Sequence, residues 1–252
     1  MNELEQVARA HLSRRALFNT AGALGAAVLL AKSGGLLGSS AIAGAAPKER
    51  LQDVLDIIST QEAFGVTLIG TVLDYAKNGA YAPAMPEKVQ KVLTNVRAQE
   101  QFHLDFFRKA GGQLRTDTFF LAEPEILRNQ LALFKDLVEL EDAAIAASMA
   151  AMPTFVRETR VDLVKANFQF AAEEAEHRLL ANRNLGPRPA NDVAFSPALF
   201  TTIDQFYALL RKKGIVGGGL GGKKITYPGA GQIDASHVIY TTPAGPQVSC
   251  SR

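Results

Sequence analysis

Four long segments with the apolar periodicity of α-helices follow one another between residues 48 and 186, and alternating strand patterns are hard to find. Glycine, asparagine or proline marks the end of each segment, and these residues commonly end helices. The predicted helices cover 48–77, 86–110, 124–153 and 159–184. We therefore predict an all-α fold in which residues 48–186 form a four-helix bundle.

The lengths of the connections predict how the helices are joined. The connections at 79–85 and 153–158 are short, as expected between antiparallel neighbours. The stretch 111–123 is longer, and fully extended it would run back along most of a long helix, on the order of 35 Å. We predict one long crossover between the second and third helices. A short helix within this stretch is the alternative.

Each predicted helix carries a row of apolar residues at alternating steps of four and three, the spacing of core positions in a bundle. One glutamate interrupts the row in every helix, and in the second and fourth helices a histidine follows it three residues later. These six residues are Glu62, Glu100, His103, Glu141, Glu174 and His177. Because residues three apart share a helix face, the glutamate and histidine of one helix can reach a common site.

Burying four carboxylates without counter-charges would cost several kcal/mol for each of them. Two metal ions would offset that cost, so we predict a dimetal site held by these six residues. Cys250 is the only cysteine, which excludes an intrachain disulfide and a site of cysteine thiolates. Carboxylate and imidazole donors suit iron or manganese, and the residue types do not decide between them.

A single Glu-x-x-His pair is weak evidence, because short motifs arise by chance. Two such pairs among four histidines would arise in roughly 2% of random sequences, before both are required to lie on core rows. Three acids lie off the rows and are expected to be solvated, namely Glu139, Glu173 and Glu176. His237 lies in a Gly- and Pro-rich tail and is expected at the surface.

Residues 1–43 have the layout of an export signal. Arg14 and Arg15 precede an apolar stretch rich in glycine and alanine at 20–31, and small residues at 41–43 form an A-x-A cleavage site. This layout resembles a twin-arginine signal peptide, so we expect export by the twin-arginine machinery to the periplasm or another extracytoplasmic space. A retained membrane anchor is the alternative, but the apolar stretch is shorter than the roughly 20 residues that a spanning helix needs.

Residues 48–186 resemble the ferritin-like superfamily, in particular the exported ferritin-like proteins that include the desiccation-related type. The matching motifs are Glu62, Glu100-Gln101-Phe102-His103, Leu140-Glu141-Asp142 and Glu174-Ala175-Glu176-His177. The resemblance implies that two glutamates bridge a pair of metal ions, Glu100 and Glu174. It also implies that Glu62 and His103 complete the coordination of one ion, and that Glu141 and His177 complete that of the other.

The same resemblance implies a function. With two histidines the centre is more similar to those of rubrerythrin and bacterioferritin than to the ferroxidase centre of storage ferritins. We expect an exported di-iron protein that oxidises Fe(II) or reduces O2 or H2O2 in redox or stress protection. No Cys-x-x-Cys pair follows the bundle, so the rubredoxin module of rubrerythrins is missing and reductive turnover would need an external electron donor.

Two other functions stay open at this point. One is a non-enzymatic envelope or stress protein whose metal pair mainly holds the four helices together. The other is a manganese catalase-like protein, since such centres also combine carboxylates with two histidines. The formal net charge of +2 gives no sign of the basic surface that nucleic-acid binding normally requires.

Residues 187–252 are predicted to form an extension of the bundle. Ser196-Pro197 begins an amphipathic helix, about 196–213, that packs on the bundle or on a second subunit of a homo-oligomer. The Gly-rich stretch 217–224 has no strand before it and no Ser or Thr after its lysines, so we do not predict phosphate binding there. The remaining tail contains short β-prone pieces and is expected to wrap the bundle, mediate assembly or lack a fixed structure.

Overall fold

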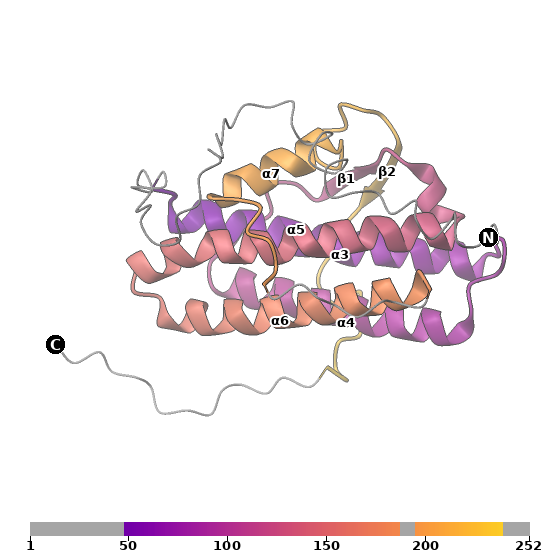
Figure 1. Ribbon diagram of the computed structural model, residues 1–252, viewed down its shortest axis with the longest axis horizontal. Coiled ribbons are helices and arrows are strands. Elements are labelled where there is room, and N and C mark those ends of the chain that lie inside the picture. Colours follow the sequence, from indigo (N-terminus) through magenta and orange to yellow (C-terminus); the bar gives the residue numbers. More distant parts are fainter. Residues whose placement is uncertain (1–47, 187–194, 239–252) are drawn as a thin grey trace, which may run out of the picture. The chain divides into compact units, whose positions relative to one another are not determined.

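The computed structural model describes residues 48–186 and 195–238 (Figure 1). The predicted export signal at 1–43 lies outside these ranges, and so do residues 187–194 and 239–252. None of the helices within the described ranges is both long enough and apolar enough to span a bilayer.

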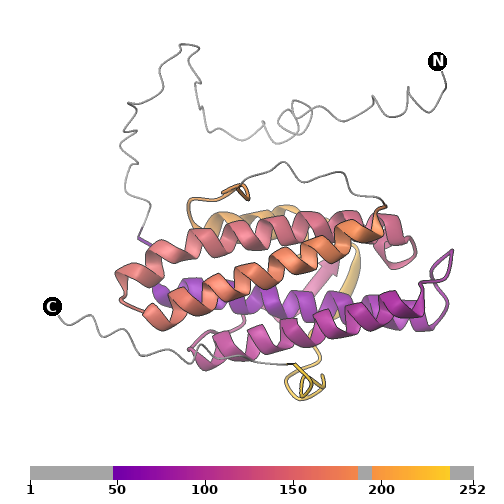
Figure 2. The same ribbon diagram turned by 60° about the horizontal axis from the view of Figure 1, so that its bottom comes forward.

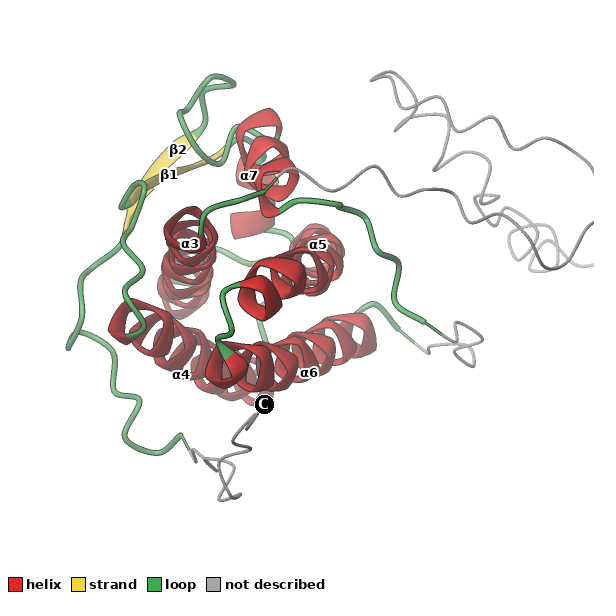
Figure 3. Ribbon diagram, turned by 90° about the vertical axis from the view of Figure 1, so that its left-hand side faces the viewer, coloured by secondary structure: helices red, strands yellow, loops and turns green. Residues whose placement is uncertain are grey.

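The described chain is mostly helical, with four long helices packed around one apolar core. These helices are α3 (Leu51–Lys77), α4 (Glu87–Lys109), α5 (Gln130–Arg157) and α6 (Val161–Asn184). Helix α3 pairs with α4, and α5 pairs with α6. Figure 2 shows the two pairs lying side by side, and Figure 3, which looks along the helices, shows all four surrounding a common centre. The two predicted hairpins and the crossover between them are confirmed.

The crossover contains a strand that the prediction missed. It holds strand β1 (Thr118–Leu121) and a short 3-10 helix, η1 (Pro124–Leu127). Strand β1 pairs antiparallel with β2 (Lys223–Thr226) from the carboxy-terminal extension. The all-α prediction is therefore wrong in this detail. The side chain of Phe119 is fully buried, and its ring centroid lies 5.4 Å from that of Phe64 on α3, so the strand is held against the bundle.

Helix α5 differs from the predicted range 124–153 at both ends. It begins at Gln130 because the side chain of Asn129 caps it, accepting a hydrogen bond from the Leu131 backbone N–H across 2.9 Å. It also continues through Pro153 as far as Arg157. The proline removes only one backbone donor, and the residue pair after it, Thr154 and Phe155, is buried and ties the last turn to the core.

The carboxy-terminal helix α7 (Ile203–Lys212) is shorter than the predicted range 196–213. Its start is set by Glu49, whose carboxylate accepts hydrogen bonds from the backbone N–H groups of Ile203 at 3.2 Å and Asp204 at 3.0 Å. An acidic side chain is favoured there because the first N–H groups of a helix lack partners within it. Helix α7 packs against α3 and α5, as expected for an extension that lies on the bundle.

Candidate metal centre

The structure brings all six predicted ligand residues together in the middle of the bundle. They come from all four long helices and form two groups. Within each group, one nitrogen or oxygen atom per residue lies within 4.8 Å of the others. The groups are Glu62, Glu100, His103 and Glu174, and Glu100, Glu141, Glu174 and His177. Because Glu100 and Glu174 belong to both groups, two carboxylates lie between two adjacent positions where a cation could be held.

The two histidines face the cluster through the same ring atom. His103 Nδ1 lies 3.3 Å from Glu62 Oε2 and 3.6 Å from Glu174 Oε1. His177 Nδ1 lies 3.1 Å from Glu100 Oε1 and 3.6 Å from Glu174 Oε2. Glu174 therefore lies between the imidazoles and presents one carboxylate oxygen to each of them.

The cluster is shielded from water. The four glutamates are between 0% and 8% exposed, His177 is buried and His103 is half-buried. Within the described residues, seven buried side-chain nitrogen or oxygen atoms have no hydrogen-bond partner, and five of them belong to this cluster. The five atoms are Glu62 Oε1, Glu62 Oε2, His103 Nδ1, Glu174 Oε1 and His177 Nδ1. Buried polar atoms are nearly always satisfied in folded proteins, so a group of five around one point indicates a missing ligand.

Burial and charge repulsion perturb the acids of the cluster. Burial, reinforced by the neighbouring glutamates, raises the pKa of Glu62 and of Glu141 well above the usual range of a carboxyl group. Burial also disfavours ionised Glu174, but the neighbouring Glu141 and the adjacent imidazoles outweigh it and lower the pKa of Glu174 to about 2. Burial opposes charge on His177 as well, yet the adjacent carboxylates of Glu100 and Glu174 raise its pKa to about 10. In the metal-free protein, protons on Glu62, Glu141 and His177 therefore offset the negative charge of the cluster.

Gly65 makes room for one of the shared carboxylates. A Cβ atom at this position of α3 would lie 2.6 Å from Glu100 Oε2, closer than real Cβ contacts allow. Glycine in the middle of a helix costs up to about 1 kcal/mol relative to alanine, so its presence here calls for a local reason. The close approach of the Glu100 carboxylate supplies that reason.

Two residues outside the predicted ligand set, Gln99 and Glu173, form a hydrogen-bonded link to His177. His177 Nε2 lies 3.2 Å from the side-chain oxygen of Gln99, and Gln99 Nε2 donates to Glu173 Oε2 across 3.4 Å. Ligand histidines in proteins typically use their second ring nitrogen in this way. Gln99 lies off the core row and Glu173 was expected to be solvated, so the periodicity of the sequence gave no sign of this link.

The other acids and the tail histidine lie apart from the cluster. Glu139 and Glu176 are exposed, as expected, whereas Glu173 is half-buried, which corrects the expectation of a solvated side chain. His237 is exposed and its Nε2 lies 3.2 Å from Asn95 Oδ1 on α4.

The donor set matches a pair of divalent ions. Four carboxylates carry the charge needed to neutralise two such ions, and each group offers three carboxylates and one imidazole. Oxygen donors with a minority of nitrogen and no sulfur suit iron or manganese. Comparison with models of protein families, with curated proteins and with solved structures finds no match to this chain.

Proposed function

We propose that this chain binds two metal ions, iron or manganese, through Glu62, Glu100, His103, Glu141, Glu174 and His177, and that the centre oxidises Fe(II) or reduces O2 or H2O2. The observation that carries the proposal is the set of five unpartnered buried atoms converging on two groups that share Glu100 and Glu174. The ferritin-like resemblance of the sequence supports the same conclusion.

The metal pair, when bound, supplies Lewis acidity and a reversible store of two electrons. The residues of this chain fix the geometry and exclude water. Glu62 and Glu174 hold their oxygens in a fully buried position, and the link from His177 to Gln99 fixes the orientation of that imidazole.

A small cavity beside the carboxylates is compatible with a small oxidant. It has a volume of about 40 Å³ and is lined by Glu100, Glu141 and Glu174, with Phe64 and Phe206 among its apolar walls. A volume of about 15 Å³ already admits one water molecule, so this space accommodates a molecule of the size of O2 or H2O2.

A structural role for the metal pair is the second candidate. The ligand residues come from all four long helices, so bound metal would cross-link both hairpins of the bundle. Metal binding without turnover would favour this function, with the carboxy-terminal extension as the part that contacts other proteins.

We also propose export by the twin-arginine route, on the basis of residues 1–43. Changing Arg14→Lys together with Arg15→Lys is expected to trap the precursor in the cytoplasm, which cell fractionation would detect. Unimpaired secretion of this variant would count against a twin-arginine signal.

Metal analysis of the purified protein tests the main proposal. We expect two ions per chain after anaerobic loading with Fe(II) or Mn(II), and consumption of O2 or H2O2 when the oxidant is added. Glu174→Gln should lower the metal content. Glu176→Gln should not, because Glu176 is an exposed acid two residues further along the same helix.

The outcomes separate the candidates. Fewer than one ion per chain in the unchanged protein, or equal metal content in both variants, would overturn the dimetal site. Full loading without turnover would leave the structural metal pair. Turnover only with Mn(II) and H2O2 would assign a catalase-like reaction.

A further inference from the structure

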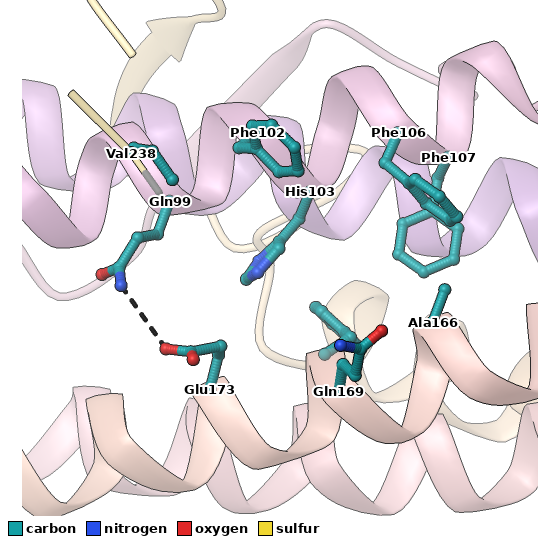
Figure 4. Close-up of a pocket in the computed structure, with 10 residues that line it drawn as sticks. Gln99, Phe102, His103, Phe106, Phe107, Ala166, Gln169, Glu173 and Val238 are labelled. Atoms are coloured by element: carbon teal, nitrogen blue, oxygen red, sulfur yellow. Dashed lines mark hydrogen bonds between the residues drawn. The ribbon is translucent and has the colours of Figure 1, made fainter. Parts of the chain in front are cut away.

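A cavity of about 140 Å³ lies between α4 and α6 and reaches the ring of His103. Residues of both helices and Val238 from the carboxy-terminal segment line it. Figure 4 shows His103 in the middle, Gln99 and Glu173 at one end, and Phe106, Phe107 and Ala166 toward the other. Because His103 also belongs to the first ligand group, a molecule in this cavity would lie beside one end of the candidate metal centre.

Aromatic rings make up most of the apolar wall. Phe102, Phe106 and Phe107 come from α4, and Phe170 comes from α6. The rings meet edge to face: Phe107 and Phe170 have centroids 5.5 Å apart at 83°, and His103 and Phe170 have centroids 5.0 Å apart at 89°. Such contacts hold the rings in place, and rings so arranged favour a further aromatic ring over a flexible chain.

The size of the cavity suits a single aromatic ring. An apolar cavity of about 150 Å³ is known to accept benzene, which sets the scale. The volume of about 140 Å³ therefore fits one aromatic ring with a small substituent.

One end of the cavity is polar and negatively charged. The half-buried carboxylate of Glu173 accepts one hydrogen bond, from Gln99 across 3.4 Å, and a carboxylate has lone pairs for several donors. No lysine or arginine is among the described residues that line the cavity. This end therefore favours a hydrogen-bond donor and disfavours an anion.

We propose that this cavity binds a molecule with one aromatic ring and one hydrogen-bond donor, such as a phenol or an aromatic amine. The ring lies among the phenylalanines against His103, and the donor points to Glu173. The inference deepens the proposed function, because it names the class of small molecule that approaches the centre from this side. The residues that line the cavity bind this molecule directly, so binding does not require a bound metal ion.

Fluorine NMR on the full chain tests the proposal in its metal-free form. The probes are 4-fluorophenol, fluorobenzene and 4-fluorobenzoate, which share a ring and differ in the polar group. We expect 4-fluorophenol to bind more tightly than fluorobenzene, and 4-fluorobenzoate not to bind. Absence of 4-fluorophenol binding, or preference for the benzoate, would overturn the proposal.

Two substitutions locate the bound ring. Ala166→Leu extends a side chain into the cavity and should weaken 4-fluorophenol binding by about tenfold or more, whereas Ala172→Leu, at an exposed position of the same helix, should not change it. Glu173→Gln keeps the shape of the polar end and removes its charge, so it should admit 4-fluorobenzoate. The ring binds elsewhere if Ala166→Leu binds 4-fluorophenol as tightly as the unchanged chain does and Glu173→Gln binds 4-fluorobenzoate no better than the unchanged chain does.

A metal-loaded sample keeps this inference distinct from the proposed function. Mn(II) is paramagnetic, so bound 4-fluorophenol should show a broadened fluorine line in the Mn(II) form and a sharp one in the Zn(II) form. Phenol binding in a chain that takes up no metal would overturn the dimetal function and leave the aromatic site. Full metal loading without any phenol binding would overturn the aromatic site and leave the dimetal function.

Discussion

His177 and Gln99 are joined across the bundle, with Nε2 of the imidazole 3.2 Å from the side-chain oxygen of the amide. An amide oxygen can only accept, so the imidazole donates through Nε2 and directs Nδ1 toward Glu100 and Glu174. The raised pKa of His177, about 10, means that Nδ1 also holds a proton in the metal-free protein. A metal ion at this position would replace that proton.

We predict that Gln99→Ala weakens metal binding at the second ligand group. Loss of the hydrogen bond frees the His177 ring to rotate, and loss of such outer partners typically costs about 10- to 100-fold in metal affinity. Competition with a chelator measures this affinity. Gln90→Ala is the matched control, because Gln90 lies on the same helix and its side chain bonds to the Met85 carbonyl. Equal affinities in the two variants would show that the link does not position a ligand.

Gly65→Ala should reduce metal content without reducing stability. The new Cβ would lie 2.6 Å from Glu100 Oε2, so the carboxylate must move away from its shared position. Replacing a helical glycine by alanine favours the helix by up to about 1 kcal/mol, which opposes any loss from crowding. Metal analysis and urea unfolding of the metal-free protein measure the two effects.

The control for this variant is Gly70→Ala. A Cβ at Gly70 would be equally crowded, 2.5 Å from the Arg97 guanidinium, but that side chain does not belong to the metal cluster. We expect Gly70→Ala to keep its metal content. If both variants bind metal normally, Gly65 is not needed to place Glu100.

The sequence predicts the hairpins and the six clustered residues because both follow from one periodicity. A core row places its members at the bundle axis, and the four glutamates lie at a similar height because each is near the middle of its helix. Gln99 lies one residue away from such a row. Its partner across the bundle depends on how closely α4 and α6 approach, and no local pattern encodes that distance.

The errors in the predicted fold have the same origin. Strand β1 exists because β2 pairs with it, with Phe119 opposite Ile225 more than a hundred residues later. Helix α7 begins at Ile203 because Glu49 caps it from the other end of the described chain. Both are contacts between distant segments, which turn and capping signals in the local sequence cannot show.

Asn167→Ala should destabilise the bundle while leaving metal content unchanged. Asn167 is fully buried, accepts from Ser148 Oγ across 2.8 Å and donates to the Ser148 carbonyl across 2.9 Å, which pins α6 to α5. Removing the amide leaves Ser148 Oγ without this partner, at a cost of about 1 to 3 kcal/mol. Urea unfolding measures the loss. Asn184→Ala, at an exposed position of the same helix, should lower the free energy of unfolding far less. A similar loss of stability in both variants would show that the hydrogen bonds between Asn167 and Ser148 do not hold α6 against α5.

The metal-free protein should lose stability as the pH rises from about 7 to about 9, and the metal-loaded protein should not. His177 has a folded pKa of about 10 and an ordinary value of 6.5, so across this range the folded state binds more protons than the unfolded state. Stability therefore falls as pH rises, by about 1 to 2 kcal/mol per pH unit. The raised pKa values of Glu62 and Glu141 act in the same direction.

Two neighbouring groups do not reverse this sign. Burial lowers the pKa of His103 below 6.5, so this imidazole is neutral in both states above about pH 7 and adds no slope. The lowered pKa of Glu174 matters only at pH values below its ordinary 4.5. A bound metal ion would replace the proton of His177, so metal binding should release protons, which calorimetry in buffers of different ionisation enthalpy detects. A flat or rising stability of the metal-free protein over this range would mean that His177 is not protonated in the empty cluster.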